Sequence, residues 1–308
     1  MTLQKTRPMG TAEWTMLLSL SALWGSSFFF FKVLVSQLPP FTVVLGRVGI
    51  AAIVLNLFLV LRGTPMTRAL PWRQFLAMGT LNNVIPFSLI VWSETRISSG
   101  LASILNATTP VFAVIAAHFF TQTEKLTGTR SIGVIFGVLG VVVLIGPDTL
   151  QGLGSKDISG EAACLLAALS YALAGIYGRR FKGLPSLKVA TGQLTSAAIV
   201  MLPIAAMTDR FWMLPMPSST AWGALAGIAL LCTVVAYILY FRILATAGAT
   251  NLLLVTFLLP VSALILGHLV LGEQIKPVAV TGMALIGGGL IAIDGRLLMR
   301  FRYRSSAT

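Results

Sequence analysis

Two stretches of this sequence carry the same series of residues with functional potential. Each stretch opens with small residues, runs apolar, and contains a proline near its middle, a histidine eight residues later and then a glutamate. The series comprises Pro110, His118 and Glu124 within residues 98–124, and Pro260, His268 and Glu273 within residues 248–273. A proline inside a helix frees backbone carbonyls, because it lacks a donor and clashes with the preceding turn. The sequence therefore predicts two membrane-spanning helices, each interrupted at its centre beside a binding cavity.

Several polar and aromatic side chains within the apolar stretches could bind a substrate. Polar residues inside a bilayer usually face the bundle interior or water, although a structural kink or hydrogen bonding between helices would explain them without a ligand. Trp24 and Tyr171 are flanked by small residues and could form the walls of a cavity, or simply pack against lipid and other helices. The other candidate substrate-binding residues are Asn82, Asn83, Asn106, Thr109, Pro110, Tyr237, Asn251 and Pro260.

Four residues could contribute charge or take part in gating. Lys32 and Arg47 lie a turn or two from the outer ends of their apolar stretches. They could extend to the membrane interface, or they could meet an anionic group such as a carboxylate. His118 and His268 lie near helix ends and could titrate near neutral pH, but we expect them to have ordinary packing or hydrogen-bonding roles.

The composition indicates a membrane protein. Of the 308 residues, 56% are hydrophobic and 10% are charged, whereas globular proteins carry about 25% charged residues. The formal net charge of +13 would suggest nucleic acid as the partner of a soluble protein, but here it indicates basic residues held at the cytoplasmic face. The two cysteines lie in apolar stretches and the two histidines are far apart, so we expect no disulfide, no metal site and no cofactor.

Hydropathy divides the chain into ten apolar stretches, and a bilayer span needs about 20 such residues. Spanning segments must be helices or closed barrels, and the in/out alternation of a barrel is missing from the sequence. We therefore predict an all-α polytopic membrane protein with ten transmembrane helices. The predicted spans are 14–35, 41–61, 74–93, 98–120, 130–147, 160–179, 188–207, 221–242, 250–271 and 277–295.

The basic residues outside the spans predict the orientation. With both termini inside, sixteen lysines and arginines fall on the cytoplasmic side and four on the opposite side. This ratio of about four to one places both termini in the cytoplasm, because cytoplasmic loops carry the excess of Lys and Arg. The chain is expected to be a multi-pass protein of the bacterial inner membrane.

The first five spans resemble the last five. Corresponding residues recur in the same order, 146 to 150 positions apart. The pairs include Val43 and Val189, Gly46 and Gly192, Trp72 and Trp222, Trp24 and Tyr171, Gly133 and Gly282, and Gly140 and Gly289. Because five is odd, the second copy must cross the membrane upside down, as in secondary transporters built from inverted repeats. The predicted organisation is a first five-helix repeat (1–147), a periplasmic linker (148–159) and a second repeat with a basic cytoplasmic tail (160–308).

Two further features bear on mechanism. The carboxylates nearest the spans, Glu13, Glu94 and Asp294, fall at span edges and not at span centres. Proton-driven exchangers often keep a buried Asp or Glu, so the sequence favours transport without a buried carboxylate as proton relay. Glycines in spans five, eight and ten allow close helix contact, and we expect them to belong to the scaffold.

The sequence resembles the EamA type of the drug/metabolite transporter superfamily. The resemblance covers nearly the whole chain and rests on LWGSSFFFFK in the first span, LGRVGIAAIVL in the second, and the central proline with a terminal glutamate in spans four and nine, as in LVLGE from Leu269 to Glu273. The first copy departs from this ending, because FFTQTE replaces an LGE-like motif. The resemblance implies ten helices in two inverted repeats and export of small metabolites by alternating access. Length and aromatic residues are similar to those of YddG-type exporters of aromatic amino acids.

We therefore expect a secondary transporter, and not an enzyme, that exports amino acids with aromatic or hydrophobic side chains. Its partners would be a small-molecule substrate and the lipid bilayer, with no nucleic acid, and the protein would act as a monomer. Export or facilitated transport of another metabolite class, such as drug-like cations or sugar or nucleotide derivatives, is an alternative. A channel, or an integral-membrane transferase, is a more distant one.

Overall fold

The computed structural model describes residues 10–120, 128–145, 156–247, 255–275 and 277–294, which form helices joined by short connections. The first half contains α1 (Thr11–Val35), α2 (Pro40–Leu61), α3 (Trp72–Gly79), η1 (Thr80–Val84), α4 (Ile85–Glu94), α5 (Ser99–Asn106), α6 (Thr109–Phe120) and α7 (Gly128–Ile145). The second half contains α9 (Lys156–Tyr177), η2 (Gly178–Phe181), α10 (Ser186–Thr208), η3 (Phe211–Met213), α11 (Ser219–Ala226), η4 (Gly227–Val235), α12 (Ala236–Thr246), α14 (Val255–Leu271) and α15 (Pro277–Asp294).

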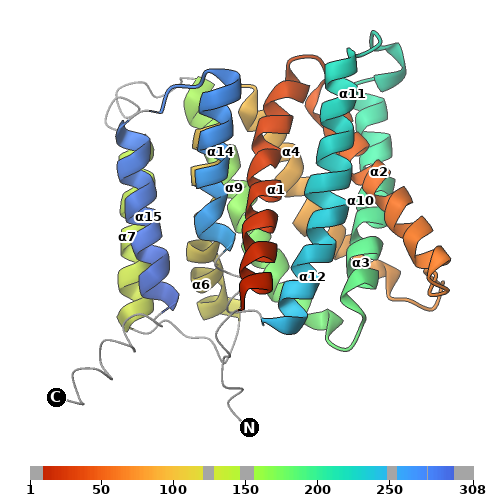
Figure 1. Cartoon of the computed structure of the whole chain (residues 1–308), viewed down its shortest axis with the longest axis horizontal. Coiled ribbons are helices and arrows are strands. Elements are labelled where there is room, and N and C mark those ends of the chain that lie inside the picture. The colour runs from red at the N-terminus through yellow and green to blue at the C-terminus, as the bar shows by residue number, and fades with distance from the viewer. Residues whose placement is uncertain (1–9, 121–127, 146–155, 248–254, 276, 295–308) are drawn as a thin grey trace.

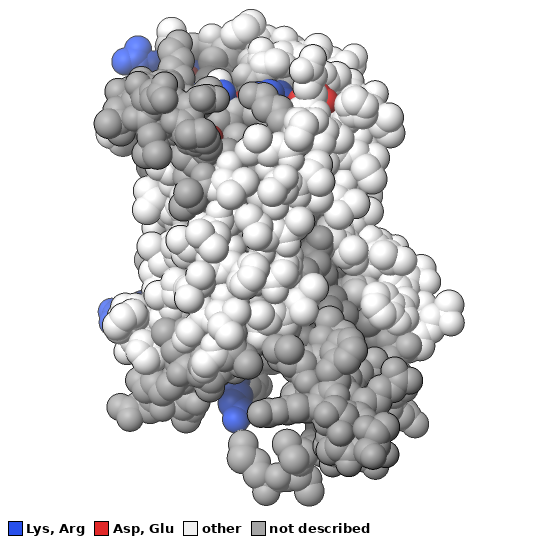
Figure 2. Space-filling view, turned by 90° about the vertical axis from the view of Figure 1, so that its left-hand side faces the viewer, with Lys and Arg blue, Asp and Glu red and all other residues white. Residues whose placement is uncertain are grey.

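These helices confirm the predicted polytopic architecture. Several follow one another within one stretch (α3–η1–α4, α5–α6, α9–η2 and α11–η4–α12). Apart from the three-residue η3, the described residues therefore form ten helical stretches at the ten predicted positions. Seven of them are long and apolar enough to cross a bilayer, and shorter apolar helices lie in α7, α14 and α15. The stretches run side by side, and the start of α1 and the end of α15 lie at the same end of the bundle (Figure 1). A broad uncharged band separates the charged side chains seen toward the two ends (Figure 2).

The contact between α7 and α15 shows the relation between the two halves. A Cβ placed on Gly289 would lie 2.6 Å from the carbonyl oxygen of Gly133, and one placed on Gly140 would lie 2.9 Å from that of Gly282. In the sequence repeat, Gly133 corresponds to Gly282 and Gly140 to Gly289, so the two contacts are exchanged by the repeat. Such reciprocity is the property of an interface on a two-fold axis.

A second pair of contacts obeys the same exchange. A Cβ on Gly46 of α2 would lie 2.8 Å from the Leu225 side chain, and one on Gly192 of α10 would meet the ring of Phe75. Gly46 corresponds to Gly192, and Phe75 lies 150 positions before Leu225. Two independent helix pairs therefore follow one pseudo-two-fold relation.

The two proline-containing spans differ from each other. In the first, the helix is broken at Ala107 and Thr108, between α5 and α6, two residues before Pro110, as predicted. In the second, α14 continues through Pro260, so the predicted interruption at this proline is wrong. Prolines are tolerated inside transmembrane helices, where neighbouring helices and local adjustments satisfy the carbonyl group that the proline frees.

The third and eighth spans each contain a π-helical segment. The segments are η1 and η4, and they occupy corresponding positions of the two repeats, about 150 residues apart. π-Helical turns in α-helices are frequent at functional sites, since they displace side chains and free backbone groups. The middle of these two spans is therefore a candidate location for a functional site.

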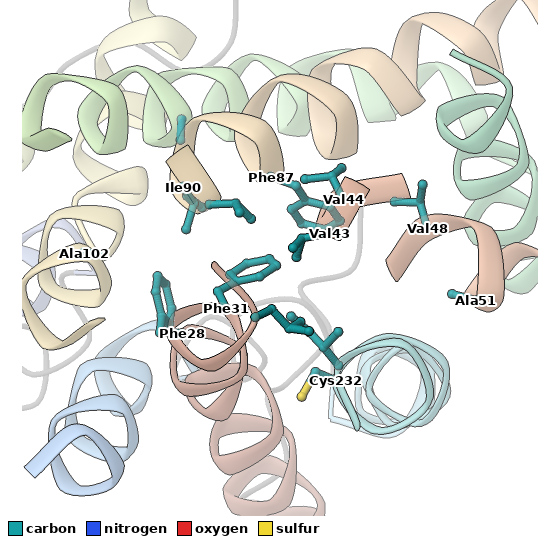
Figure 3. Packing of buried hydrophobic residues seen from close by; sticks show 14 of the residues in the cluster. Phe28, Phe31, Val43, Val44, Val48, Ala51, Phe87, Ile90, Ala102 and Cys232 are labelled. Carbon is teal, nitrogen blue, oxygen red and sulfur yellow. The ribbon is translucent and has the colours of Figure 1, made fainter. Parts of the chain in front are cut away.

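One large cluster of buried apolar side chains contains residues of both repeats. Phe28 and Phe31 of α1 face Phe87 and Ile90 of α4, with side chains of α2 beside them (Figure 3). This cluster continues onto η4 through Cys232 (Figure 3). The cluster therefore joins helices of both repeats.

The glycine contacts generate a stability prediction. Gly289→Ala should destabilise the protein by about 1–3 kcal/mol, because the added methyl group forces α7 and α15 apart. Gly288→Ala is the matched control, because nothing lies within 4 Å of its Cβ position, and it should stabilise the helix by up to about 1 kcal/mol. Thermal unfolding of both variants in the same detergent tests this, and equal shifts in melting temperature would contradict the described packing.

Candidate substrate site between the repeats

Arg47 of α2 is a cation inside the membrane-spanning part of the bundle, with only 5% of its surface exposed. Its guanidinium carbon lies 3.9 Å from the ring centre of Phe87 and 5.1 Å from that of Phe31. Its Nε donates a hydrogen bond of 3.1 Å to the Thr233 hydroxyl. Ring faces attract a cation more strongly when water is excluded. The side chain is therefore held inward, and the predicted alternative of extension to the interface does not describe it.

The guanidinium is only partly satisfied. Within the described residues, its two terminal nitrogens make no hydrogen bond, and the bundle provides Arg47 with no carboxylate partner within ion-pair distance. The hydroxyls of Tyr171 and Tyr237 lie near enough to Arg47 for direct electrostatic interaction. An ionisable residue inside a membrane without a protein counter-ion is a candidate for binding an anionic ligand group.

A chain of hydrogen bonds crosses from one repeat to the other beside Arg47. The Asn82 amide donates to Gln193 Oε1 at 3.1 Å, and Gln193 Nε2 donates to the Tyr237 hydroxyl at 3.2 Å. Asn83, next to Asn82, is fully buried beside the Tyr237 hydroxyl, and its amide nitrogen and oxygen make no hydrogen bond of good geometry. A buried amide without a partner costs free energy, so Asn83 is available to a polar ligand.

The π-helical segments position these groups. Asn82 and Asn83 belong to η1, and Thr233 belongs to η4, where its hydroxyl donates to the carbonyl oxygen of Ile228, five residues earlier, at 2.9 Å. The hydroxyl of Ser170 on α9 donates to the carbonyl oxygen of Leu81 in η1 at 2.7 Å. Side-chain hydroxyls thus donate to backbone carbonyls in the irregular turns. Asn82 lies against Gln193, and Asn83 lies beside Tyr237.

The site is built from positions that the pseudo-two-fold relation matches in the two repeats. Arg47 follows Gly46 and Gln193 follows Gly192 in the matched segments, and Thr233 lies 150 positions after Asn83. Arg47 bonds to span eight through Thr233, whereas Gln193 bonds to span three through Asn82. Sequence reasoning overlooked Gln193, although the alignment of Gly-Arg with Gly-Gln in the two copies could have revealed it.

The structure brings five of the predicted site residues into this one cluster. They are Asn82, Asn83, Tyr171, Tyr237 and Arg47. Trp24 belongs to a different cluster, where its ring centre lies 5.7 Å from that of Tyr240.

The predicted residues of span four lie at its helix break. The Thr109 hydroxyl donates to the carbonyl oxygen of Asn106 at 2.7 Å, and the amide oxygen of Asn106 is buried without a partner. Pro110 is half-buried in the first turn of α6. In span nine, Pro260 is buried within α14, and Asn251 lies outside the described residues.

The charged candidates other than Arg47 lie elsewhere. Lys32 donates to the carbonyl oxygens of Glu94 at 2.7 Å and Ile97 at 2.9 Å, so it caps the end of α4. His268 is exposed, with Nδ1 3.0 Å from the Glu273 carbonyl oxygen, and His118 lies near the end of α6 with its ring 5.1 Å from that of Phe119.

A carboxylate joins the two repeats where α4 and α14 end, at the top of Figure 1. We call this the Glu273 end. Glu273 accepts hydrogen bonds from the backbone nitrogens of Ser99 and Gly100 and from the Ser99 hydroxyl, at 2.9, 3.2 and 2.8 Å. A carboxylate at a helix N-terminus satisfies free N–H groups and interacts favourably with the helix dipole. Glu273 therefore fastens the end of α14 to the start of α5.

Comparison with known proteins places this architecture in a family. The model of the EamA-like transporter family matches residues 12–146 and again residues 158–293. The chain belongs to the EamA-like transporter family. This confirms the resemblance stated from the sequence, and the family consists of membrane transporters with two repeats.

The relatives are transporters by name. The chain is similar to the uncharacterized transporter YoaV of Bacillus subtilis, with 24% identity over 89% of this chain and 94% of the relative. It is also similar to the uncharacterized inner membrane transporter YedA of Escherichia coli, with 26% identity over 88% and 86%. A crystal structure with 18% identity superposes with a TM-score of 0.66 over 94% of this chain and 99% of the other, which shows the same fold.

The Glu273 contact predicts a measurable coupling in this EamA protein. Glu273→Ala should destabilise it by about 1–3 kcal/mol, because charge-assisted hydrogen bonds are lost. The double variant with Ser99→Ala should lose less stability than the sum of the two single losses, because both variants remove the same hydroxyl–carboxylate bond. Thermal unfolding of the four proteins measures this. Gln274→Ala, at the exposed neighbouring position, is the control, and strictly additive losses at Glu273 and Ser99 would refute the contact.

Proposed function

We propose that this EamA-family transporter exports amino acids with apolar or aromatic side chains across a bacterial inner membrane by alternating access. Both termini would face the cytoplasm, in agreement with the excess of Lys and Arg on that side. The observation that carries the substrate class is the buried guanidinium of Arg47, which lies between aromatic rings and has two unused terminal nitrogens.

The carboxylate of an amino acid fits this guanidinium. Arginine presents parallel N–H groups that bind a carboxylate through two hydrogen bonds, and such charge-assisted bonds are stronger than neutral ones. Because the Nε of Arg47 is already bonded to Thr233, the two terminal nitrogens are the ones a carboxylate would take. Binding would supply the counter-charge that the described part of the chain does not.

The surrounding residues suit the rest of the molecule. An α-ammonium group needs acceptors, and the unpartnered amide oxygen of Asn83 and the hydroxyl of Tyr237 provide them. The rings of Phe31, Phe87 and Tyr171 favour an apolar or aromatic side chain, because aromatic pairs gain energy beyond the area that they bury. A sugar or nucleotide phosphate would need more positive charge than Arg47 alone, since Lys32 caps α4 through backbone carbonyls.

Transport by the purified protein in liposomes tests the proposal. Counterflow of labelled L-phenylalanine should saturate, and Arg47→Gln should lower kcat/KM by about 10- to 100-fold, as expected for loss of charged hydrogen bonds of roughly 1.5–3 kcal/mol. Phenethylamine, which lacks the carboxylate, should compete poorly with L-phenylalanine for the wild-type protein.

Arg96→Gln is the matched control for Arg47→Gln. The Arg96 guanidinium also lies over an aromatic ring, 3.6 Å from the centre of Trp92, but it lies beyond the end of α4 and outside the site. The Arg96→Gln variant should leave counterflow of L-phenylalanine unchanged. Full activity of Arg47→Gln, or equal competition by phenethylamine and L-phenylalanine, would show that Arg47 does not bind a substrate carboxylate.

A further inference from the structure

Glu94, the last residue of α4, is a buried acid that the proposed transport cycle does not use. It has no exposed surface, and both carboxylate oxygens lack a hydrogen-bond partner. Sequence reasoning placed it at a span edge and favoured transport without a buried carboxylate as proton relay. Close packing by α9 explains the difference. A Cβ on Gly160 would lie 3.1 Å from the Ile97 side chain and 3.3 Å from the carbonyl oxygen of Ser93, so the start of α9 covers the end of α4.

The ionisable groups around Glu94 come from several helices. Lys32 of α1 interacts with it electrostatically, but the Lys32 ammonium group makes its hydrogen bonds to the carbonyl oxygens of Glu94 and Ile97. Glu273, beyond α14, adds a negative charge nearby. Two further ionisable groups, Cys164 and Glu161, lie on α9. Cys164 Sγ is 3.0 Å from the Ser93 hydroxyl.

Among the described residues, the other helices packed against α4 bring no further acid toward Glu94. Arg47 of α2 lies against Phe87, two turns before Glu94, and the sequence of α5 contains no titratable side chain. In the described part of the chain, Lys32 is the cation that interacts with Glu94, and it is engaged by carbonyl oxygens. Glu273 repels an ionised Glu94, and Glu161, which also interacts with Cys164, is a second nearby acid.

Glu94 and Glu273 differ in the hydrogen-bond donors available to their ionised carboxylates. Ionised Glu273 has three donors. Ionised Glu94 would have no hydrogen-bond donor among the described residues, and a buried carboxylate without donors is costly. When packing and the Glu273 contact close this end, Glu94 therefore stays protonated and neutral. When the end opens, water can solvate the carboxylate.

We propose that Glu94 is a proton-binding site, and that proton binding there is linked to closure of the Glu273 end. On closure, the carboxylate takes one proton from the aqueous phase that faces this end and becomes a neutral carboxylic acid. On opening, the proton returns to that phase. Because linkage is reciprocal, protons stabilise the closed form by as much as closure strengthens proton binding. This inference adds a second ligand, and it does not depend on which substrate is carried.

Infrared spectroscopy of the full-length protein in lipid nanodiscs, without substrate, tests the site directly. At neutral pH the wild type should show the C=O stretching band of a protonated carboxylic acid. Glu94→Gln should remove this band, whereas Glu13→Gln, at the opposite end of the bundle, should leave it in place. Persistence of the band in Glu94→Gln, or its absence from the wild type, would overturn the proposal.

The native thiol of Cys164 reports closure, because it is fully buried beside Glu94. In a Cys232→Ser background, maleimide labelling should speed up at alkaline pH as Glu94 loses its proton and the end opens. Glu94→Gln mimics the neutral acid and should label about tenfold more slowly than the wild type at that pH, within the usual range of linkage. At acidic pH the two should match. Equal labelling at every pH would show that Glu94 is not linked to closure.

Discussion

Arg47 is a cation enclosed by helices in a region where the bilayer offers no water, and the organisation of the site depends on how this charge is held. An unpaired charge in such a place is costly. Two aromatic rings and the Thr233 hydroxyl stabilise the guanidinium without neutralising it. In the proposed function, the remaining N–H donors of Arg47 would give an anionic ligand a large share of its binding energy, because these donors lack partners in the described part of the protein.

The inverted repeat explains why the site lies where it does. The glycine contacts of α7 with α15, and those of Gly46 and Gly192, are exchanged by one pseudo-two-fold relation. Arg47 and Gln193 are matched by the same relation, and each bonds to a span that carries a π-helical segment. Polar groups from both repeats therefore meet near the axis. A small relative movement of the repeats would change all of these contacts together, as alternating access requires.

The sequence predicted the helices well, because ten long apolar stretches leave few alternatives in a bilayer. It also predicted that Asn82, Asn83, Tyr171, Tyr237 and Arg47 are functional candidates. Their grouping could not be read from the sequence, because it depends on how α2 and α10 pack against spans three and eight. Trp24 packs against Tyr240 instead, and α14 continues through Pro260. Burial of Glu94 was missed because hydropathy locates the end of a span and not the neighbour that covers it.

The central claim is that a substrate carboxylate binds Arg47 between the two repeats. A structure determined by electron microscopy with saturating L-tryptophan tests this claim most directly. The account predicts ligand density between α2, η1 and α12, with the carboxylate against the terminal nitrogens of Arg47. Density at another position, with Arg47 still enclosed by Phe31 and Phe87 and free of the ligand, would contradict it.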